Sequence, residues 1–271
     1  MTHPLCLAHL SVQELSPPQV VEVAAQAGFP LVSLRLAPAA DGERQHPMLG
    51  GTPMMAETRA RLRDLGVAVH DVELVRLTAR TDVDALQPLL AAAAELGARQ
   101  VLVAGDEPCS DALAQRFADL CALGSRHGLR MGVEFMPWRG INNLAAARSL
   151  VDFVGAGGVV VDAIHLDRSG GTAADLQQLP LGQWAWFQIC DAPRQRPATR
   201  DELLFQARQA RRPPGQGGLD LEGMVRALPP GCVVSVEAPL HGLPDLLPPA
   251  KRARLLRHAT LQVLEKAQPD A

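Results

Sequence analysis

The chain has 271 residues, of which 47% are hydrophobic, and its 26 Lys and Arg against 29 Asp and Glu give a net charge of -3. This length and apolar content can bury a full core, which excludes the disordered and fibrous classes. The near-neutral charge argues against a dedicated nucleic-acid binder. Five scattered cysteines without a CxxC pair, no 18-residue apolar run and no visible signal peptide lead us to expect a cytoplasmic protein that does not enter a membrane.

Short apolar stretches alternate with amphipathic ones along the whole chain. Those rich in Val, Leu and Ile predict strands that are buried on both faces, at Pro4–Leu10, Leu31–Leu36, Val67–Val75, Gln100–Ala104, Arg130–Phe135, Gly158–Ala163, Trp184–Cys190 and Cys232–Val236. The stretches between them predict helices from Ser16-Pro17 to Gly28, from Thr52-Pro53 to Gly66, at Asp82–Leu96, Asp111–His127 and Asn143–Val154, after Thr172, after Leu219 and at Pro249–Lys266.

Eight units of one strand followed by one helix in 271 residues indicate an α/β fold. We expect a (β/α)8 TIM barrel that forms a single domain over residues 1–271. The alternative is an open doubly wound sheet, which normally carries a glycine-rich phosphate loop after its first strand. Residues 9–14 read HLSVQE and contain no glycine. The two most irregular regions, Pro38–Gly51 and Asp191–Gly218, follow strands, so in a barrel they lie on the face where active sites are built.

Polar side chains stand at the ends of four consecutive predicted strands, namely Glu134, Asp162, Gln188 and Glu237. A single carboxylate at a strand end is explained equally well by a salt bridge at the barrel rim or by a role as a helix cap. Three that converge on one point are costly to bury, because like charges in a dry site need a cation. Carboxylate and amide oxygens suit a hard divalent ion such as Mg²⁺ or Mn²⁺.

These residues resemble the xylose-isomerase-like TIM barrels, the sugar (phosphate) isomerase/epimerase superfamily. The resemblance rests on Glu134 in VEF, on Asp162-x-x-His165, on Glu237 in SVEAP and on the loop Arg211-x-x-Pro-Gly-x-Gly. It implies that Glu134, Asp162 and Glu237 are metal ligands and that His165 faces the substrate. It also implies that Glu134 and Glu237 are the acid–base pair of an isomerase or epimerase, which removes a proton beside a carbonyl through a metal-stabilised enediolate.

The seventh strand departs from this pattern. Many members of the family have a histidine ligand where this chain has Gln188 in FQICDA. An amide oxygen makes the site all-oxygen, which favours Mg²⁺ or Mn²⁺ over Co²⁺ or Zn²⁺. Glutamine here also resembles the 3-dehydroshikimate dehydratases, lyases that begin with the same proton abstraction. The other interpretation is that Gln188 marks a lost or weakened metal site.

Candidate substrate-binding residues lie near strand ends and in loops: His165, Arg168, Arg208, Arg211, Arg35 and Glu73. Arginine side chains match carboxylate or phosphate geometry, although a rim ion pair or a solvated helix face explains them as well. We expect a small-molecule partner such as a sugar, a cyclitol or a hydroxy-carbonyl acid, and a homo-oligomer is possible. A non-catalytic sugar-binding barrel and a metal-dependent endonuclease remain as alternatives. The net charge and Gln188 argue against the endonuclease.

Overall fold

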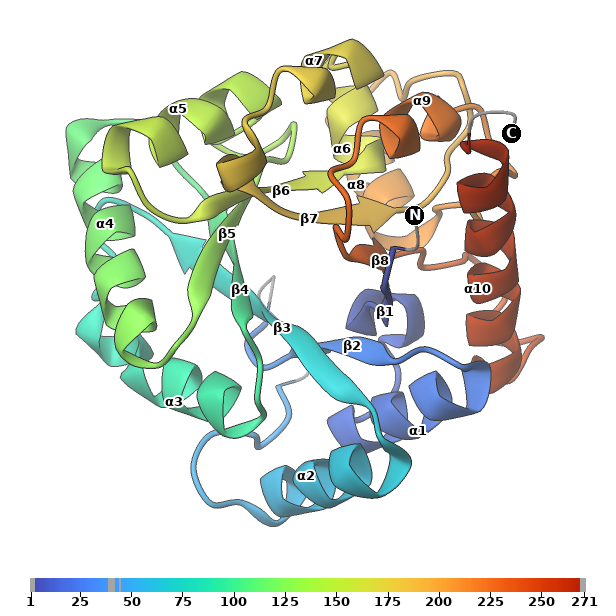
Figure 1. Ribbon diagram of the computed structural model, residues 1–271, viewed down its shortest axis with the longest axis horizontal. Helices are drawn as coiled ribbons and strands as arrows, with labels where there is room; N and C mark the ends of the chain where they lie inside the picture. The colour runs from blue at the N-terminus through green and yellow to red at the C-terminus, as the bar shows by residue number, and fades with distance from the viewer. Residues whose placement is uncertain (1–2, 39–41, 44, 269–271) are drawn as a thin grey trace.

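A computed structural model gives the structure of the protein and describes residues 3–38, 42–43 and 45–268. Its parallel strands follow the order of the sequence around a closed barrel, in which β1 pairs with β8 (Figure 1). The predicted barrel is therefore confirmed, and the open sheet is excluded. The strands are β1 (Leu5–Leu7), β2 (Leu31–Arg35), β3 (Ala68–Leu77), β4 (Gln100–Gly105), β5 (Arg130–Glu134), β6 (Gly158–Asp162), β7 (Trp184–Ile189) and β8 (Val234–Val236).

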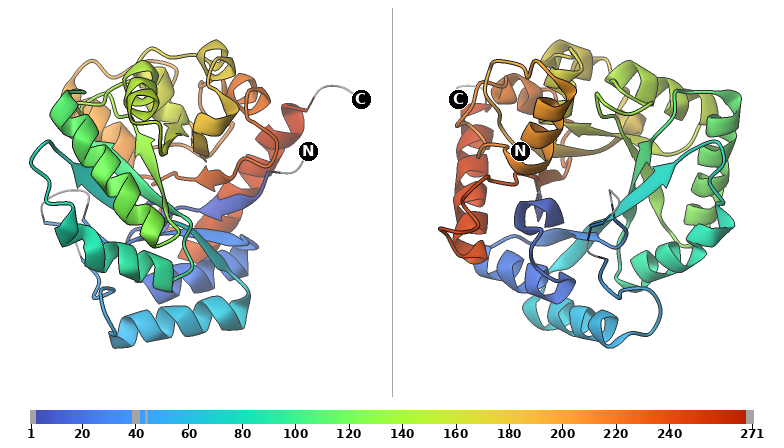
Figure 2. Two further views of the ribbon diagram at one scale, coloured as in Figure 1. Left: turned by 60° about the vertical axis from the view of Figure 1, so that its left-hand side comes forward. Right: turned by 180° about the vertical axis from the view of Figure 1, so that it is seen from behind.

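Helices surround the barrel on the outside, as the views in Figures 1 and 2 show. They are α1 (Pro17–Ala27), α2 (Pro53–Leu65), α3 (Gln87–Glu95), α4 (Asp111–Arg126), α5 (Leu144–Val154), α6 (Ala163–Arg168), α7 (Ala173–Gln177), α8 (Arg200–Gln209), α9 (Leu221–Arg226) and α10 (Pro249–Lys266), with 3-10 turns η1 (His9–Val12), η2 (Asp84–Leu86) and η3 (Leu181–Gln183). None of the helices in the described ranges is long and apolar enough to cross a membrane.

The structure departs from the predicted elements in several places, two of which lie near the candidate site. The first strand ends at Leu7, because the chain turns into η1 over residues that were expected to extend it. The region Asp191–Gly218, expected to be irregular, contains α8, which begins with a capping box at Thr199. In the other irregular region, Pro38–Gly51, residues 39–41 and 44 lie outside the described residues.

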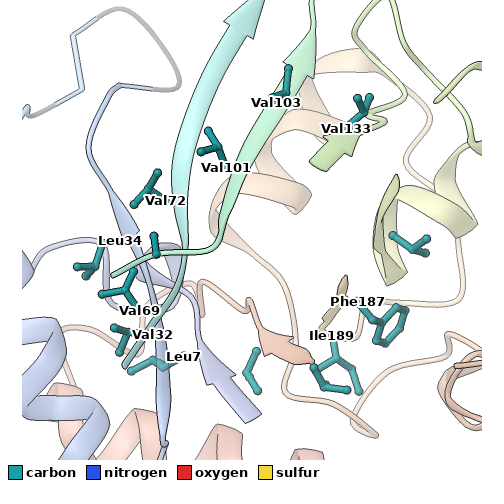
Figure 3. Close-up of a cluster of buried hydrophobic side chains, with 14 of the residues drawn as sticks. Leu7, Val32, Leu34, Val69, Val72, Val101, Val103, Val133, Phe187 and Ile189 are labelled. Carbon is teal, nitrogen blue, oxygen red and sulfur yellow. The ribbon is translucent and has the colours of Figure 1, made fainter. Parts of the chain in front are cut away.

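Alternation along the strands decides which side chains face the barrel axis. Val32 and Leu34 of β2, like Phe187 and Ile189 of β7, belong to the large hydrophobic cluster that includes residues of the surrounding helices (Figure 3). The residues between them, Ser33 and Gln188, therefore point inward. The same alternation turns Glu134, Asp162 and Glu237 inward, because the residues that flank each of them belong to that cluster: Val133, Phe135, Val161, Ala163, Val236 and Ala238.

The barrel interior has an apolar side and a polar side. A second, smaller cluster consists of Leu74, Leu102, Ala104, Val160 and Trp186 of β3, β4, β6 and β7, together with Met136 just after β5. The strands β1, β2, β3 and β8 instead contribute buried polar side chains or thiols, namely Cys6, Ser33, Asp71 and Ser235. The candidate metal ligands come from β5, β6, β7 and β8, where each strand reaches the loops that follow it.

Candidate metal centre and substrate pocket

The junction between β6 and α6 places Asp162 and His165 side by side. Asp162 ends β6 and caps α6, since its Oδ1 accepts hydrogen bonds from the backbone N–H groups of Ile164 at 2.8 Å and His165 at 3.4 Å. The capped turn brings His165 Nε2 to 4.0 Å from Asp162 Oδ2 and to 3.5 Å from Glu134 Oε1. The D-x-x-H spacing is thus explained by one helical turn.

All four predicted ligand residues lie in the same buried region. Glu134, Asp162, Gln188 and Glu237 have at most 4% of their surfaces exposed. Gln188 Nε2 donates to Glu237 Oε1 at 3.2 Å. The other end of that amide, Gln188 Oε1, is buried and has no hydrogen-bond partner among the described residues. A buried oxygen without a partner beside carboxylates costs free energy unless a hydrogen-bond donor or a metal ion binds it.

Arg211 provides the positive charge within this cluster. Its Nη1 donates to Asp162 Oδ2 at 2.6 Å and to the Glu237 carbonyl at 3.0 Å, and its Nη2 lies 3.0 Å from Glu237 Oε2. Its Nε donates to the carbonyl of Ala207 at 2.6 Å. The side chain predicted to bind substrate therefore joins two candidate metal ligands, and only 4% of the residue is exposed.

One arginine does not balance three carboxylates, and the pKa values reflect this. Burial raises the pKa of Glu134 well above its ordinary range, and the charges of Glu237 and Asp162 add to the effect. Burial also raises the pKa of Glu237 to about 8, although Arg211 opposes the rise. Burial would raise the pKa of Asp162 as well, but Arg211 holds it below its ordinary value. Additional positive charge would therefore favour the ionised forms of Glu134 and Glu237.

The donor set fits a divalent cation. Ligand atoms of Glu134, Asp162 and His165 all lie within 4.8 Å of one another and could hold a metal ion. Gln188 Oε1 and His165 Nδ1 are buried without partners in the described part of the chain. Burial lowers the pKa of His165 to about 4, so its imidazole is neutral at physiological pH. Neutral imidazole, carboxylates and an amide oxygen are all metal ligands.

A pocket open to solvent lies at this cluster. Glu134, His165 and Glu237 line it together with Glu73 and Leu102. Four arginines, Arg35, Arg139, Arg208 and Arg211, line it as well. A small polar molecule in the pocket would therefore meet both carboxylates and guanidinium groups.

Three of these arginines have carboxylate partners. Arg35 Nη2 lies 2.8 Å from Glu73 Oε2, Arg139 is paired with Asp106, and Arg211 is bound as described above. Arg208 makes no hydrogen bond or ion pair with any residue that the structure describes, and its guanidinium carbon lies 5.9 Å from the ring centroid of Trp138. Arg208 is thus the pocket cation left for an external anion.

Two other predicted features have structural roles outside the pocket. Arg168 does not line it, since its guanidinium donates to Gln206 Oε1 at 2.9 Å and to the Pro193 carbonyl at 2.6 Å and pairs with Asp167. The Pro-Gly-x-Gly loop is bound to buried Asp191, which accepts hydrogen bonds from the N–H groups of Gly217 at 2.8 Å and Leu219 at 3.1 Å. A Cβ atom on Gly217 would lie 2.2 Å from Asp191 Oδ1, so the loop requires glycine there.

Trp138 and Arg139 both line the pocket; from the sequence Arg139 was not expected there, and Trp138, just past a strand end, fitted ligand stacking and rim packing equally well. The ring of Trp138 meets that of His165 nearly edge-on, with centroids 5.0 Å apart. The available signal was position: both residues follow closely after the strand that ends in Glu134. His9, which follows the first strand, is structural, because Nε2 bonds to the Leu15 carbonyl and Nδ1 accepts from the Arg35 N–H, each at 3.0 Å.

Comparisons with solved structures agree with this fold. The IolI protein with a bound zinc atom matches with a TM-score of 0.79 at 17% identity, covering 98% of this chain and 100% of that chain. The probable 3-DHS dehydratase AsbF from Bacillus anthracis matches with a TM-score of 0.74 at 16% identity over 95% and 99%. D-allulose 3-epimerase from Methylomonas sp. matches with a TM-score of 0.70 at 15% identity over 97% and 98%.

At these identities the likeness is one of fold alone, and no curated protein matches the sequence. The model of a protein family described as xylose isomerase-like TIM barrel matches residues 21–259. That match spans the strands β2 to β8 and every candidate metal ligand. The chain belongs to the xylose isomerase-like TIM barrel family.

Proposed function

We propose that this protein is a divalent-metal-dependent isomerase or epimerase that acts on an anionic sugar derivative, such as a sugar phosphate or a sugar acid. The observation that carries the proposal is the buried cluster of Glu134, Asp162 and Glu237, two of which line an open pocket, together with the unpartnered oxygen of Gln188. Three carboxylates and one guanidinium leave room for two more positive charges. The IolI neighbour has a bound zinc atom, which supports metal binding by a barrel of this fold.

Glu134, Asp162, Gln188 and Glu237 would hold the ion. When bound, it supplies positive charge that polarises the substrate carbonyl and makes the neighbouring C–H more acidic. Glu134 and Glu237 both line the pocket, so one can take the proton from that carbon and the other can return one. Neutral His165 has one ring nitrogen near Glu134 and the other unpartnered, so its Nδ1 remains for a hydrogen bond to a substrate oxygen.

Arg208 selects for a negative charge on the substrate. A planar guanidinium without a carboxylate partner matches a carboxylate or phosphate group, and Trp138 holds it at the pocket wall. Arg208→Met should raise KM roughly 10- to 100-fold and change kcat little, because a hydrogen bond to a charged group is worth about 1.5–3 kcal/mol. Arg200→Met is the matched control, since Arg200 is exposed on the same helix.

A 3-dehydroshikimate dehydratase-type lyase is the second candidate. Gln188 at the seventh-strand position and the anion-binding Arg208 favour it, because the substrate of such an enzyme carries a carboxylate. The first step would be the same proton abstraction, after which the substrate loses a hydroxyl group instead of regaining a proton. The AsbF neighbour shows that the same fold occurs in a probable enzyme of this kind.

The test is proton exchange in D2O, with chelator-treated protein resupplied with Mn²⁺ or Mg²⁺. Anionic ketoses, sugar acids and 3-dehydroshikimate are followed by NMR. Deuterium beside the carbonyl of a sugar derivative, with a new isomer, supports the isomerase; a new aromatic acid from 3-dehydroshikimate supports the lyase. Glu237→Gln should abolish either reaction. Binding of these compounds with no exchange under any metal would refute both and favour a non-catalytic binding barrel.

A further inference from the structure

A chain of buried hydrogen bonds connects the barrel interior with the pocket, apart from the candidate metal ligands. It joins the neighbouring strands β2 and β3 (Figure 1), where Ser33 is in register with Asp71 and Arg35 with Glu73. Ser33 Oγ lies 2.6 Å from Asp71 Oδ2 and 2.7 Å from Glu73 Oε1. Ser33 and Asp71 are 1% exposed and Glu73 is 2% exposed, so bulk water does not separate these groups.

The number of protons in this chain is fixed by its geometry. A hydroxyl has one proton to donate, yet Ser33 makes two oxygen–oxygen contacts short enough to be hydrogen bonds. Ser33 can donate to only one carboxyl group. The other contact must contain a proton that belongs to the carboxyl group itself, so either Asp71 or Glu73 is a neutral acid.

The surroundings place that proton on Asp71. Glu73 Oε2 accepts from Arg35 Nη2 at 2.8 Å and from Nε at 3.2 Å, which stabilises the ionised form of Glu73. Asp71 forms no ion pair with any described residue. The groups that affect its charge are Ser33, Glu73 and Glu237, and Asp71 in turn acts on Cys6, so it meets no cation. Burial, and next the charge of Glu73, raise the pKa of Asp71 well above its ordinary value, whereas Arg35 lowers that of Glu73 against the effect of burial.

We infer that Asp71 is a neutral carboxylic acid in the working protein and that it is a positioning residue for the pocket. Its O–H donates to Ser33 Oγ, the Ser33 O–H donates to Glu73 Oε1, and Glu73 holds the guanidinium of Arg35. Glu73 and Arg35 both line the pocket, so this chain fixes the wall that a substrate contacts. The protonation state stands on the hydrogen count and on the pairing of Arg35 with Glu73, whereas the positioning role rests on the proposed function.

Neutrality explains why an aspartate is tolerated so deep in the barrel. An ionised Asp71 would add a negative charge to a region that already holds Glu73, Glu134 and Glu237. A neutral acid instead supplies the hydrogen-bond donor that Ser33 needs. Asparagine offers an N–H donor of nearly the same shape, so Asp71→Asn should keep the chain intact, whereas Asp71→Ala and Ser33→Ala should break it.

Infrared spectroscopy tests the protonation state directly. At neutral pH the wild type should show the carbonyl stretch of a buried protonated carboxylic acid that Asp71→Asn lacks. Glu134 and Glu237 can contribute similar bands, so the comparison is repeated in a Glu134→Gln/Glu237→Gln background, where the band that Asp71→Asn removes should persist. Equal protonated-acid absorption with and without Asp71 in both backgrounds would overturn the inference.

Kinetics test the positioning role. Asp71→Ala and Ser33→Ala should raise KM several-fold at nearly unchanged kcat, and Asp71→Asn should keep the wild-type KM. Wild-type KM in both alanine variants, or a raised KM in Asp71→Asn, would overturn that role. If Asp71→Ala does not fold, Ser33→Ala and Asp71→Asn still decide. Failure of the proposed function would appear differently, as a wild type without turnover, and the infrared result would be unaffected by it.

Discussion

Arg211 gives the sharpest prediction about the energetics of the site. Its guanidinium contacts Asp162 at 2.6 Å and Glu237 at 3.0 Å, and both carboxylates are almost fully buried. Arg211→Met removes the cation and leaves the two carboxylates without it. Breaking a buried ion pair by removal of one partner costs about 3–5 kcal/mol. At roughly 2–4 °C per kcal/mol for a domain of this size, the metal-free variant should melt about 6–20 °C below the wild type.

The assay is thermal unfolding at pH 7 after treatment with a chelator, followed by circular dichroism. Arg212→Met is the matched control, since Arg212 is adjacent and exposed, and its side chain makes one long hydrogen bond with the described residues, 3.3 Å to the Gln216 carbonyl. Its effect should stay within about 0.5 kcal/mol. Added Mn²⁺ should raise the melting temperature of Arg211→Met more than that of the wild type, because the competing cation is gone. A metal-free Arg211→Met that melts with the wild type would refute this electrostatic account.

Three further predictions concern residues around the site. Burial lowers the pKa of His9 to about 4 from an ordinary value of 6.5, so its stabilising effect is complete above pH 6.5 and is lost as the pH falls toward 4. The difference between wild type and His9→Asn in urea-unfolding free energy should shrink by about 3 kcal/mol over that interval. Gly217→Ala forces a Cβ against Asp191 and should cost about 1–3 kcal/mol by urea unfolding, whereas Gly182→Ala meets no atom within 4 Å and should be neutral. Arg168→Met should lower the melting temperature and leave KM unchanged, because the side chain lies outside the pocket; a raised KM would return Arg168 to the binding site.

The strands and the inward direction of their polar residues were predictable from the sequence, because alternation along a buried strand is a local property. Eight apolar stretches predicted the barrel, and the position of Glu134, Asp162, Gln188 and Glu237 at strand ends predicted that they would converge. Asp162-x-x-His165 was found by resemblance, and the structure adds its cause, the capped first turn of α6.

The contacts of long side chains beyond the strands were not predictable in the same way. Arg211 and Arg168 looked alike in the sequence, but Arg211 reaches Asp162 and Glu237, whereas Arg168 is held by Gln206 and a backbone carbonyl. Which carboxylate an arginine meets depends on how loops far apart in the sequence pack together. The helix α8 was missed although its capping box was present at Thr199, because the surrounding prolines and glycines indicated an irregular loop.

The central claim is that Glu134, Asp162, Gln188 and Glu237 hold one divalent cation, and Mn²⁺ titration of chelator-treated protein tests it most directly. Electron paramagnetic resonance of free Mn²⁺ counts the bound ions, and thermal unfolding gives the linked stabilisation. We predict one ion per chain, displaced by Mg²⁺, with about 2.7 kcal/mol of added stability at 100 times the dissociation constant. Binding should be lost in Glu134→Gln and Glu237→Gln variants that fold normally. No bound Mn²⁺ in the wild type, or equal binding in both variants, would contradict the account.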